Sequence, residues 1–369
     1  MEKPEVILEI LEQNGYEAYY VGGCVRDTLL GRPIHDWDIT TSALPEQTMA
    51  CFSHSIPTGM EHGTITVLCG DCKAEVTTFR SDGVYLDGRH PEQVTFVPSL
   101  KEDLARRDFT INAMAMDRNG TLFDPMGGRE DLQAGILRCV GEPHKRFRED
   151  ALRMLRALRF SAQLGFAIEP QTDAAIFDCA HLCAALSAER VRDEVEKTLC
   201  SPNPGHVGRM IEAGLLHAFD LREDRDTQRL SAVPAEPLVR WSGLCKLYPE
   251  LDLTQLRLDR KTCRIAGAAA EAKEPNCDRQ WKQLVADVGM ETAETAAALW
   301  ERTEELRRVC ETGQCMILKD LAVSGRDLPW LQGKAVGFTL RRLLEHVWEH
   351  PQDNKKETLL LLAQQMKEP

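Results

Sequence analysis

The chain has 369 residues, with 45 basic and 58 acidic side chains and a formal net charge of −13. Hydrophobic residues make up 43% and charged residues 28%, a balance that is typical of a folded globular protein and excludes a disordered chain. No apolar run reaches the roughly 18 residues that a membrane-spanning helix needs. The length suits about two to four domains.

The thirteen cysteines show no regular spacing, and the acidic N-terminus MEKPEVILEI lacks the basic region of a signal peptide. We therefore expect reduced thiols in a cytoplasmic protein, and nothing indicates a membrane or a protein partner. The one C-x-x-C motif is Cys69-Gly70-Asp71-Cys72, between two β-type runs. Its two central residues favour a hairpin turn, with a metal or redox site as the less favoured alternative.

The first 140 residues mix helical and strand periodicity. Helices are expected over 6–11 and 24–30 and after the capping box Ser99-x-x-Glu102. Strands are expected at 19–21, 34–40, 64–68, 74–79, 94–97, 111–117 and 121–124. Because several of these strands are joined as hairpins, we predict a mixed or antiparallel sheet.

Beyond about residue 140 the strand signals fade, and helical patterns broken by glycine and proline follow one another. These patterns predict helices over 147–165, 170–186, 187–200, 204–218, 292–309, 338–349 and 355–367. The predicted fold class is therefore α+β, a head with a sheet followed by an all-helical remainder.

Gly22-Gly23-x-x-Arg26-Asp27 follows the strand at 19–21 and opens a helix. Two glycines at such a turn let the backbone approach a phosphate closely, and a helix N-terminus favours anions. Arg26, about one turn inside the helix, is placed to reach the same phosphates. We therefore predict nucleotide phosphate contacts at Gly22, Gly23 and Arg26.

Asp36-Trp37-Asp38 lies ten residues further along the chain, on a predicted strand. Side chains two apart on a strand project from the same face, so Asp36 and Asp38 present two carboxylates together. Such a pair suits hard divalent cations in phosphoryl or nucleotidyl transfer. Alone the pattern is typical of a solvated surface, and the preceding Gly-Gly turn favours the metal site.

These motifs resemble the class II tRNA nucleotidyltransferases, which include the bacterial CCA-adding enzymes and poly(A) polymerases. The resemblance spans about residues 19–200 and extends to ARRDFTINAMA (105–115), DPMGGREDL (124–132), FREDALRMLRALRF (147–160) and SAERVRDEVEKTL (187–199). It implies a polymerase-β-like nucleotidyltransferase head, Mg²⁺ held by Asp36 and Asp38, and triphosphate or sugar contacts from Gly23, Arg26 and Arg107. Glu75 stands where a third acidic residue of such a site is expected, with an ordinary hairpin charge as the alternative.

The segment FREDALRMLRALRF gathers its charges on one side of a predicted helix. A carboxylate accepting from an amino group, beside a guanidinium donating to a ring nitrogen, admits C and A and repels U and G. Asp150 and Arg153, one turn apart, offer that pair, and the resemblance implies that Glu149 positions the arginine. Arg156 and Arg159 are predicted to meet phosphates, with salt bridges to neighbouring helices as the alternative. A solvated face with i,i+4 pairs is the alternative for the whole helix.

The resemblance implies a catalytic head at 1–140, a base-recognising neck at 141–205 and a tRNA-binding body and tail at 206–369. It implies template-independent addition of C, C and A to tRNA from CTP and ATP, with Mg²⁺ as cofactor. Residues 81–91 resemble the flexible loop of enzymes that add the terminal A. The A-adding half of a split system, a poly(A) polymerase and a non-catalytic RNA-binding homologue remain alternatives.

Overall fold

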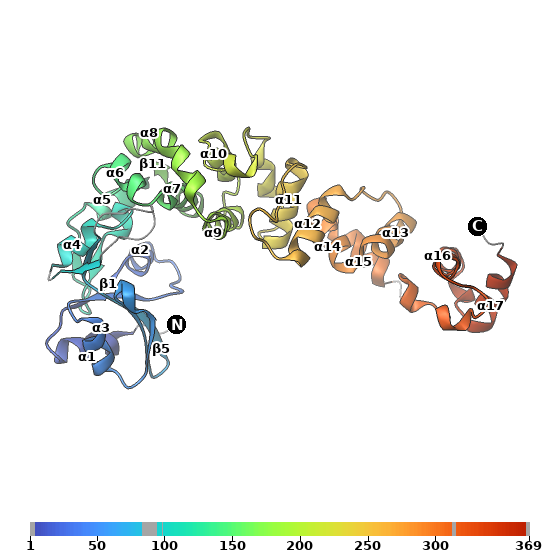
Figure 1. Ribbon diagram of the computed structural model, residues 1–369, viewed down its shortest axis with the longest axis horizontal. Coiled ribbons are helices and arrows are strands. Elements are labelled where there is room, and N and C mark those ends of the chain that lie inside the picture. The colour runs from blue at the N-terminus through green and yellow to red at the C-terminus, as the bar shows by residue number, and fades with distance from the viewer. Residues whose placement is uncertain (1–3, 83–93, 98, 312–314, 367–369) are drawn as a thin grey trace. The chain divides into compact units, whose positions relative to one another are not determined.

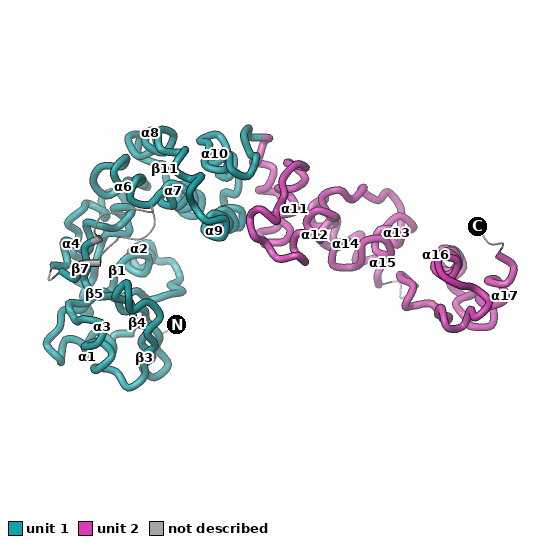
Figure 2. The backbone as a smooth tube through the Cα atoms, in the orientation of Figure 1, with its two compact units in different colours: residues 1–224 teal, residues 225–369 magenta. Residues whose placement is uncertain are grey.

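The computed structural model describes residues 4–82, 94–97, 99–311 and 315–366. Figure 2 shows its two compact units, residues 1–224 and 225–369. Most of the loop that resembles the A-adding element, residues 83–91, lies outside the described residues.

The first unit combines short strands with ten α-helices in its described part; Figure 1 shows their arrangement. The strands are β1 (Ala18–Val21), β2 (Asp38–Thr41), β3 (Ser55–Gly59), β4 (Thr64–Cys69), β5 (Cys72–Thr78), β6 (Arg80–Asp82), β7 (Val94–Phe96), β8 (Ala115–Met116), β9 (Leu122–Phe123), β10 (Ile136–Leu137) and β11 (Ala167–Ile168). The helices are α1 (Glu5–Gln13), α2 (Gly23–Leu29), α3 (Pro45–Cys51), α4 (Leu100–Ala105), α5 (Gly128–Ala134), α6 (Pro143–Glu149), α7 (Leu152–Leu164), α8 (Pro170–Cys179), α9 (Ala188–Leu199) and α10 (His206–Glu212).

Seven strands form the main sheet, in the order β3-β4-β5-β2-β1-β8-β9. The pair β2–β5 is parallel and the other neighbours are antiparallel, so the predicted mixed sheet is confirmed. The hairpins expected around Gly70-Asp71 and around 118–120 are the pairs β4–β5 and β8–β9.

The two faces of this sheet are covered by different helices (Figure 1). On one face, α1 and α3 contact β1, β4 and β5. On the other, Leu100 and Leu104 of α4 pack on Tyr19 and Val21 of β1. Strand side chains alternate between these faces, so residues in step with Val21 lie on the α4 side.

Three sequence predictions in the head are wrong. The strand expected over 111–117 is only β8 at Ala115–Met116, because Thr110–Asn112 form a short 3₁₀ helix instead. The strand expected from residue 34 begins only at Asp38, because the ladder with β5 begins at the Asp38–Glu75 pair and β1 pairs no further back than Ile39. Asp36 therefore lies in the segment that leads into β2. The predicted capping box is also absent, since Ser99 precedes α4 without a side-chain capping hydrogen bond.

The single helix predicted over 147–165 is interrupted. Asp150 ends α6 with an extended backbone, and its carboxylate accepts a hydrogen bond of 3.0 Å from the Leu152 amide at the start of α7. Aspartate at this position caps a new helix, and this local bond competes with continuation of the old one. The helices expected over 170–186 and 204–218 also end early, at Cys179 and Glu212.

The described part of the second unit is helical and contains no strand. Its helices are α11 (Pro237–Leu247), α12 (Arg260–Glu271), α13 (Asp278–Val288), α14 (Met290–Leu299), α15 (Thr303–Glu311), α16 (Lys334–Glu349) and α17 (Lys356–Gln365). The helix predicted over 292–309 is thus two helices, α14 and α15. Separate cores surround Trp281 in α13 and Leu343 in α16. Among all described residues, none of the helices is long and apolar enough to cross a membrane.

Candidate active site

Three carboxylates meet on the α4 side of the sheet. Asp38 is the first residue of β2, and its partner in the parallel β2–β5 ladder is Glu75. The ladder extends one step further back, where the Glu75 amide donates to the Trp37 carbonyl at 2.9 Å. Asp36, two residues before Asp38, is exposed like Glu75, whereas Asp38 is half-buried. The register of β2 against β5 therefore brings Asp38 and Glu75 together, and Asp36 lies close enough for its charge to act on Asp38.

The environment of Asp38 disfavours its charged form. Burial, together with the negative charges of Glu75 and Asp36, raises the pKa of Asp38 to about 6, while Arg107 opposes the shift. Like-charged carboxylates held close together are stabilised by a cation, which restores the ionised form. The cluster is thus electrostatically prepared for a metal ion.

The carboxylates of this site fit a hard cation that is bound jointly by the protein and by substrate phosphates. Within the described residues, no group of three or more His, Cys, Asp or Glu side chains encloses a metal site by itself. Mg²⁺ is commonly bound by one or two carboxylates plus substrate phosphates and waters. Asp36 and Asp38 supply that number of carboxylates, so the donor set fits a cation that is also bound by substrate phosphates.

Gly22 makes the close approach at this site possible. It precedes α2 with φ 76° and ψ −132°, a conformation that residues with a side chain rarely adopt. A Cβ at this position would stand 3.1 Å from Nη1 of Arg107 and 3.7 Å from Oδ2 of Asp38. Nε of Arg107 is buried without a hydrogen-bond partner among the described residues. Arg107 therefore lies beside the Gly-Gly turn and the acidic cluster with unused donor capacity.

Replacing Gly22 by alanine is expected to destabilise the head by about 1–3 kcal/mol, because alanine is strained at this φ and crowds Arg107. Gly23→Ala is the matched control, since a Cβ there meets only Nη2 of Arg26 at an ordinary 3.8 Å. It should stay within about 1 kcal/mol of the unaltered chain. Urea unfolding of both variants measures the difference, and equal midpoints would contradict the strain argument.

Arg26 is held by the protein itself. Its guanidinium donates to both carboxylate oxygens of Asp27, at 3.0 and 2.9 Å, and to Oδ1 of Asn112 at 2.8 Å. The side chain is 8% exposed. Nη2 of Arg26 also lies near the Gly23 position. Arg26 thus stands at the predicted phosphate turn in a fixed orientation.

The predicted base-reading arginine, Arg153, is buried at the junction of the head and α7. Its Nη1 donates to Glu149 at 3.0 Å and its Nη2 to the Arg106 carbonyl at 3.1 Å. Glu149 is held in turn by Arg146 at 2.7 Å. The arrangement matches the positioning role that the resemblance implies for Glu149.

Asp150 is oriented from two sides. One oxygen accepts the Leu152 amide, and both oxygens accept from Nη2 of Arg190 on α9, at 3.2 and 2.9 Å. Arg190 belongs to the segment 187–199, one of the motifs that carry the resemblance. The chain thus fixes both members of the predicted Asp150–Arg153 pair, although they do not share one helix.

Three arginines surround the ring of Phe160 in α7. The guanidinium carbons of Arg26, Arg156 and Arg159 lie 5.2, 5.2 and 3.9 Å from the ring centroid. Cations over an aromatic face are attracted by its quadrupole. This ring therefore joins α2 of the head to α7.

Arg156 and Arg159 each have an acidic partner as well. Arg156 donates to Oδ2 of Asp108 at 2.8 and 2.6 Å. Although burial opposes ionisation, Arg156 lowers the pKa of Asp108 to about 2. Arg159 pairs with the buried Glu194 of α9. The salt bridges considered as alternatives for these arginines are thus present, and their contacts with phosphates stay predictions.

Several residues around the site were not singled out from the sequence. Asp103 of α4 bonds to both Arg106 and Arg107, and its i,i+3 and i,i+4 spacing was the available signal. Asp108 and Asn112 lie inside the motif at 105–115, but their partners Arg156 and Arg26 come from elsewhere in the chain. Only the fold reveals such pairs.

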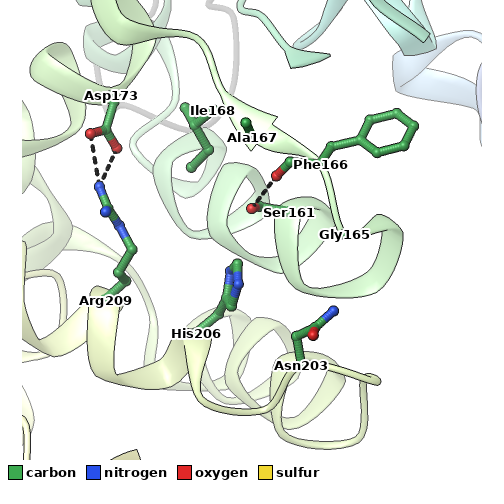
Figure 3. Close-up of a pocket in the computed structure, with 9 residues that line it drawn as sticks. All are labelled: Ser161, Gly165, Phe166, Ala167, Ile168, Asp173, Asn203, His206 and Arg209. Carbon is green, nitrogen blue, oxygen red and sulfur yellow. Dashed lines mark hydrogen bonds and ion pairs between the residues drawn. The ribbon is translucent and has the colours of Figure 1, made fainter. Parts of the chain in front are cut away.

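A separate pocket lies away from the acidic cluster (Figure 3). Its volume is about 540 Å³, and its lining includes the ion pair between Arg209 and Asp173. Burial lowers the pKa of His206 on its wall. No sequence-predicted site residue lines this pocket.

The C-x-x-C motif forms the turn of the β4–β5 hairpin, with Cys69 opposite Cys72. All thirteen cysteines lie in the described residues, and each is a thiol rather than half of a disulfide. The hairpin reading is therefore confirmed.

Two family models match this chain. The Poly A polymerase head domain covers residues 18–138, and the probable RNA and SrmB-binding site of polymerase A covers residues 165–220. The CCA-adding enzyme of Geobacillus stearothermophilus is 42% identical over 93% of this chain and 90% of its own length. That of Enterococcus faecalis is 38% identical over 99% of this chain and 96% of its own.

The fold agrees with these relatives. A crystal structure of the Bacillus stearothermophilus CCA-adding enzyme in complex with CTP superimposes with a TM-score of 0.86 at 38% identity. The match covers 99% of this chain and 98% of that one. The mixed-sheet head, the carboxylates at the start of β2 and on β5, and the similarity over nearly the whole chain lead to one conclusion: the chain belongs to the CCA-adding enzymes, which are class II tRNA nucleotidyltransferases.

Proposed function

We propose that this chain adds C, C and A to the 3′ end of tRNA from CTP and ATP, without a nucleic-acid template and with release of pyrophosphate. The observation that carries the proposal is the meeting of Asp36, Asp38 and Glu75 beside the Gly22 turn, in a chain similar over its whole length to CCA-adding enzymes. In each cycle the terminal tRNA hydroxyl attacks the α-phosphate of the bound nucleotide, and pyrophosphate leaves.

The residues of the head have distinct parts in this reaction. Asp36 and Asp38 hold the divalent cation that the family requires, and we propose that it is Mg²⁺, with Glu75 completing the negative site. When bound, Mg²⁺ neutralises phosphate charge and lowers the pKa of the attacking hydroxyl. Gly22 and Gly23 bring the backbone close to the triphosphate, because neither presents a side chain.

Arginines supply the positive charge around the nucleotide. Arg107 has a buried Nε without a partner among the described residues and donates toward the triphosphate or sugar. Arg26 meets the phosphates at the Gly-Gly turn. Arg156 and Arg159 meet phosphates of the nucleotide or of the RNA end, exchanging part of their present bonds to Asp108 and Glu194. A phosphate can replace these carboxylates, since a guanidinium group binds phosphate and carboxylate alike through bidentate hydrogen bonds.

Asp150 and Arg153 select the base. The carboxylate accepts from the amino group of cytosine or adenine, and the guanidinium donates to the adjacent ring nitrogen. Uracil and guanine present the reverse pattern, so a carbonyl acceptor would face the carboxylate and an N–H donor would face the guanidinium. Arg190 and Glu149 hold the two side chains in place.

We assign residues 1–140 to the catalytic head, 141–205 to the neck and 206–369 to the body and tail. The body and tail hold tRNA, whose A-form arms offer shape and backbone rather than readable base edges. We place the reaction in the cytoplasm, which the thirteen thiols support.

Acid is expected to inhibit by protonating Asp38. Its pKa is raised to about 6, so the carboxylate is protonated below that pH and loses its affinity for the cation. Because metal and proton compete, raising the Mg²⁺ concentration should shift the acid limb of the rate profile to lower pH. Rates measured from pH 5 to 8 at two Mg²⁺ concentrations test this, and an acid limb that does not move with Mg²⁺ would contradict it.

Extension of two tRNAs tests the function. One tRNA ends before C-C and the other ends in C-C, and each is incubated with Mg²⁺ and with each nucleoside triphosphate separately and together. Three nucleotides on the first and one A on the second are expected. Extension of the C-C-ended tRNA alone would make this the A-adding half of a split system. Long A tails on unrelated RNA would indicate a poly(A) polymerase, and no extension would favour the non-catalytic homologue.

A further inference from the structure

One buried carboxylate beside the site has no role in the chemistry described above. Asp103 of α4 is 0% exposed. Although burial opposes ionisation, Arg107 and Arg106 lower the pKa of Asp103, so it is charged at neutral pH. A fully buried charge is costly unless it is paired and hydrogen-bonded, so its partners indicate what it stabilises.

The two oxygens of Asp103 have different partners. Oδ1 accepts from Nε and Nη2 of Arg106, at 3.0 and 2.8 Å, and from the Arg80 amide at 3.3 Å. Oδ2 accepts from the Thr40 hydroxyl at 3.2 Å and from Nη2 of Arg107 at 3.3 Å. Arg106 already neutralises the carboxylate through Oδ1. The bond from Oδ2 to Arg107 is therefore additional to what charge balance requires.

Arg107 is fixed by this bond at one end and faces the site with the other. Its Nη2 is on Asp103, while its Nη1 lies nearest the Gly22 position, where a Cβ would stand 3.1 Å away. The positive charge of Arg107 also acts on Asp38, where it counteracts the rise in the pKa of that carboxyl group. Thr40, the other donor to Oδ2, is two residues from Asp38 on the same face of β2. Asp103 thus connects the arginine to the strand that carries the metal ligand.

We propose that Asp103 is a positioning residue for nucleotide binding: it holds the Arg107 guanidinium over the Gly22-Gly23 turn in the orientation that meets the triphosphate. The proposal rests on the proposed function, since it requires that Arg107 contacts the nucleotide. Asp103 itself touches neither substrate nor metal. Its effect passes through one ion pair, so the pair can be tested as a unit.

Steady-state kinetics of Asp103→Asn, Arg107→Ala and the double variant test the coupling. Asparagine keeps the shape and removes the charge, so Nη2 of Arg107 loses a charged acceptor. We expect the KM for CTP and ATP to rise about tenfold or more in each single variant. The KM for tRNA should stay within about twofold, and the double variant should be no worse than Arg107→Ala, because both changes remove the same interaction.

Asp131→Asn is the matched control. Asp131 is also buried in the head and also bonds to a threonine and an arginine, Thr110 and Arg138. This control should lose stability without a selective rise in the KM for CTP. Asp103→Glu, which retains the charge, should recover part of the lost nucleotide affinity.

If Asp103→Asn does not fold, a milder variant still tests the positioning role. Thr40→Val removes only the hydroxyl donor to Oδ2, and we expect the KM for CTP to rise about two- to fivefold. The same substitution in the Arg107→Ala background should have no further effect on that KM. An equal effect in both backgrounds would overturn the positioning role.

The remaining outcomes distinguish failure of the positioning role of Asp103 from failure of the proposed function. If the rise in the KM for CTP in the double variant equalled the product of the rises in Asp103→Asn and Arg107→Ala, Asp103 would act independently of Arg107. That result would overturn the inference. Equal rises in the KM for CTP and for tRNA, matched by the Asp131 control, would also overturn it in favour of a structural role. Failure of the unaltered chain to extend tRNA would instead overturn the proposed function.

Discussion

The double variant Asp36→Asn with Asp38→Asn is expected to lower nucleotide incorporation by about a thousandfold or more, because the cation contributes several kcal/mol of transition-state stabilisation. Both C and A addition should be lost together, since they share one metal site. Incorporation of radiolabelled CTP and ATP into tRNA at saturating Mg²⁺ measures the loss. Retained activity would refute the metal site.

The variant is expected to fold normally. Burial and the charges of Glu75 and Asp36 disfavour the ionised form of Asp38 more strongly than Arg107 favours it, so neutral amides relieve a net unfavourable charge. The thermal unfolding midpoint should therefore be no lower than that of the unaltered chain. Asp71→Asn, in the exposed turn of the β4–β5 hairpin, is the control and should keep full activity.

Arg153→Ala is expected to relax base selection. Without the guanidinium, nothing donates to the ring nitrogen of cytosine or adenine and nothing repels the ring N–H of uracil or guanine. Loss of one charged hydrogen bond predicts that the preference for CTP over UTP falls about 10- to 100-fold. Values of kcat/KM for the four nucleoside triphosphates on the same tRNA measure the preference.

The surrounding contacts indicate that this variant folds. Glu149 keeps its bond to Arg146 at 2.7 Å, so the substitution leaves no buried carboxylate without a partner. Arg148→Ala, on the exposed side of α6, is the matched control and should leave the preference unchanged. An unaltered ratio of CTP to UTP in Arg153→Ala would contradict the base-reading role.

Local chemistry explains why much of the head was predictable. Gly22 has a positive φ that glycine adopts without strain, so the Gly-Gly turn was visible in the sequence. Gly70-Asp71 between two alternating runs indicated a hairpin, and the β4–β5 pair confirms it. Such features depend on neighbouring residues and therefore leave a local pattern.

Element ends were less predictable, because competing local bonds decide them. The hydrophobic positions of 147–160 continue across residue 150, so periodicity predicted one helix. The Asp150 carboxylate instead caps the amide of Leu152, and α6 and α7 separate there. Likewise β2 begins at Asp38, where its pairing with β5 begins, a condition that periodicity does not contain.

The sequence by itself determined the fold class, the α+β head before a helical remainder, and the motifs that carry Asp36, Asp38, Asp150 and Arg153. Only the tertiary structure decided that Glu75 stands beside Asp38, because strand register depends on pairing between segments far apart in the chain. It also decided which distant acids hold the arginines of α7: Asp108 for Arg156 and Glu194 for Arg159. A buried charge takes its partner from whatever the packing brings near, and that packing belongs to the whole fold.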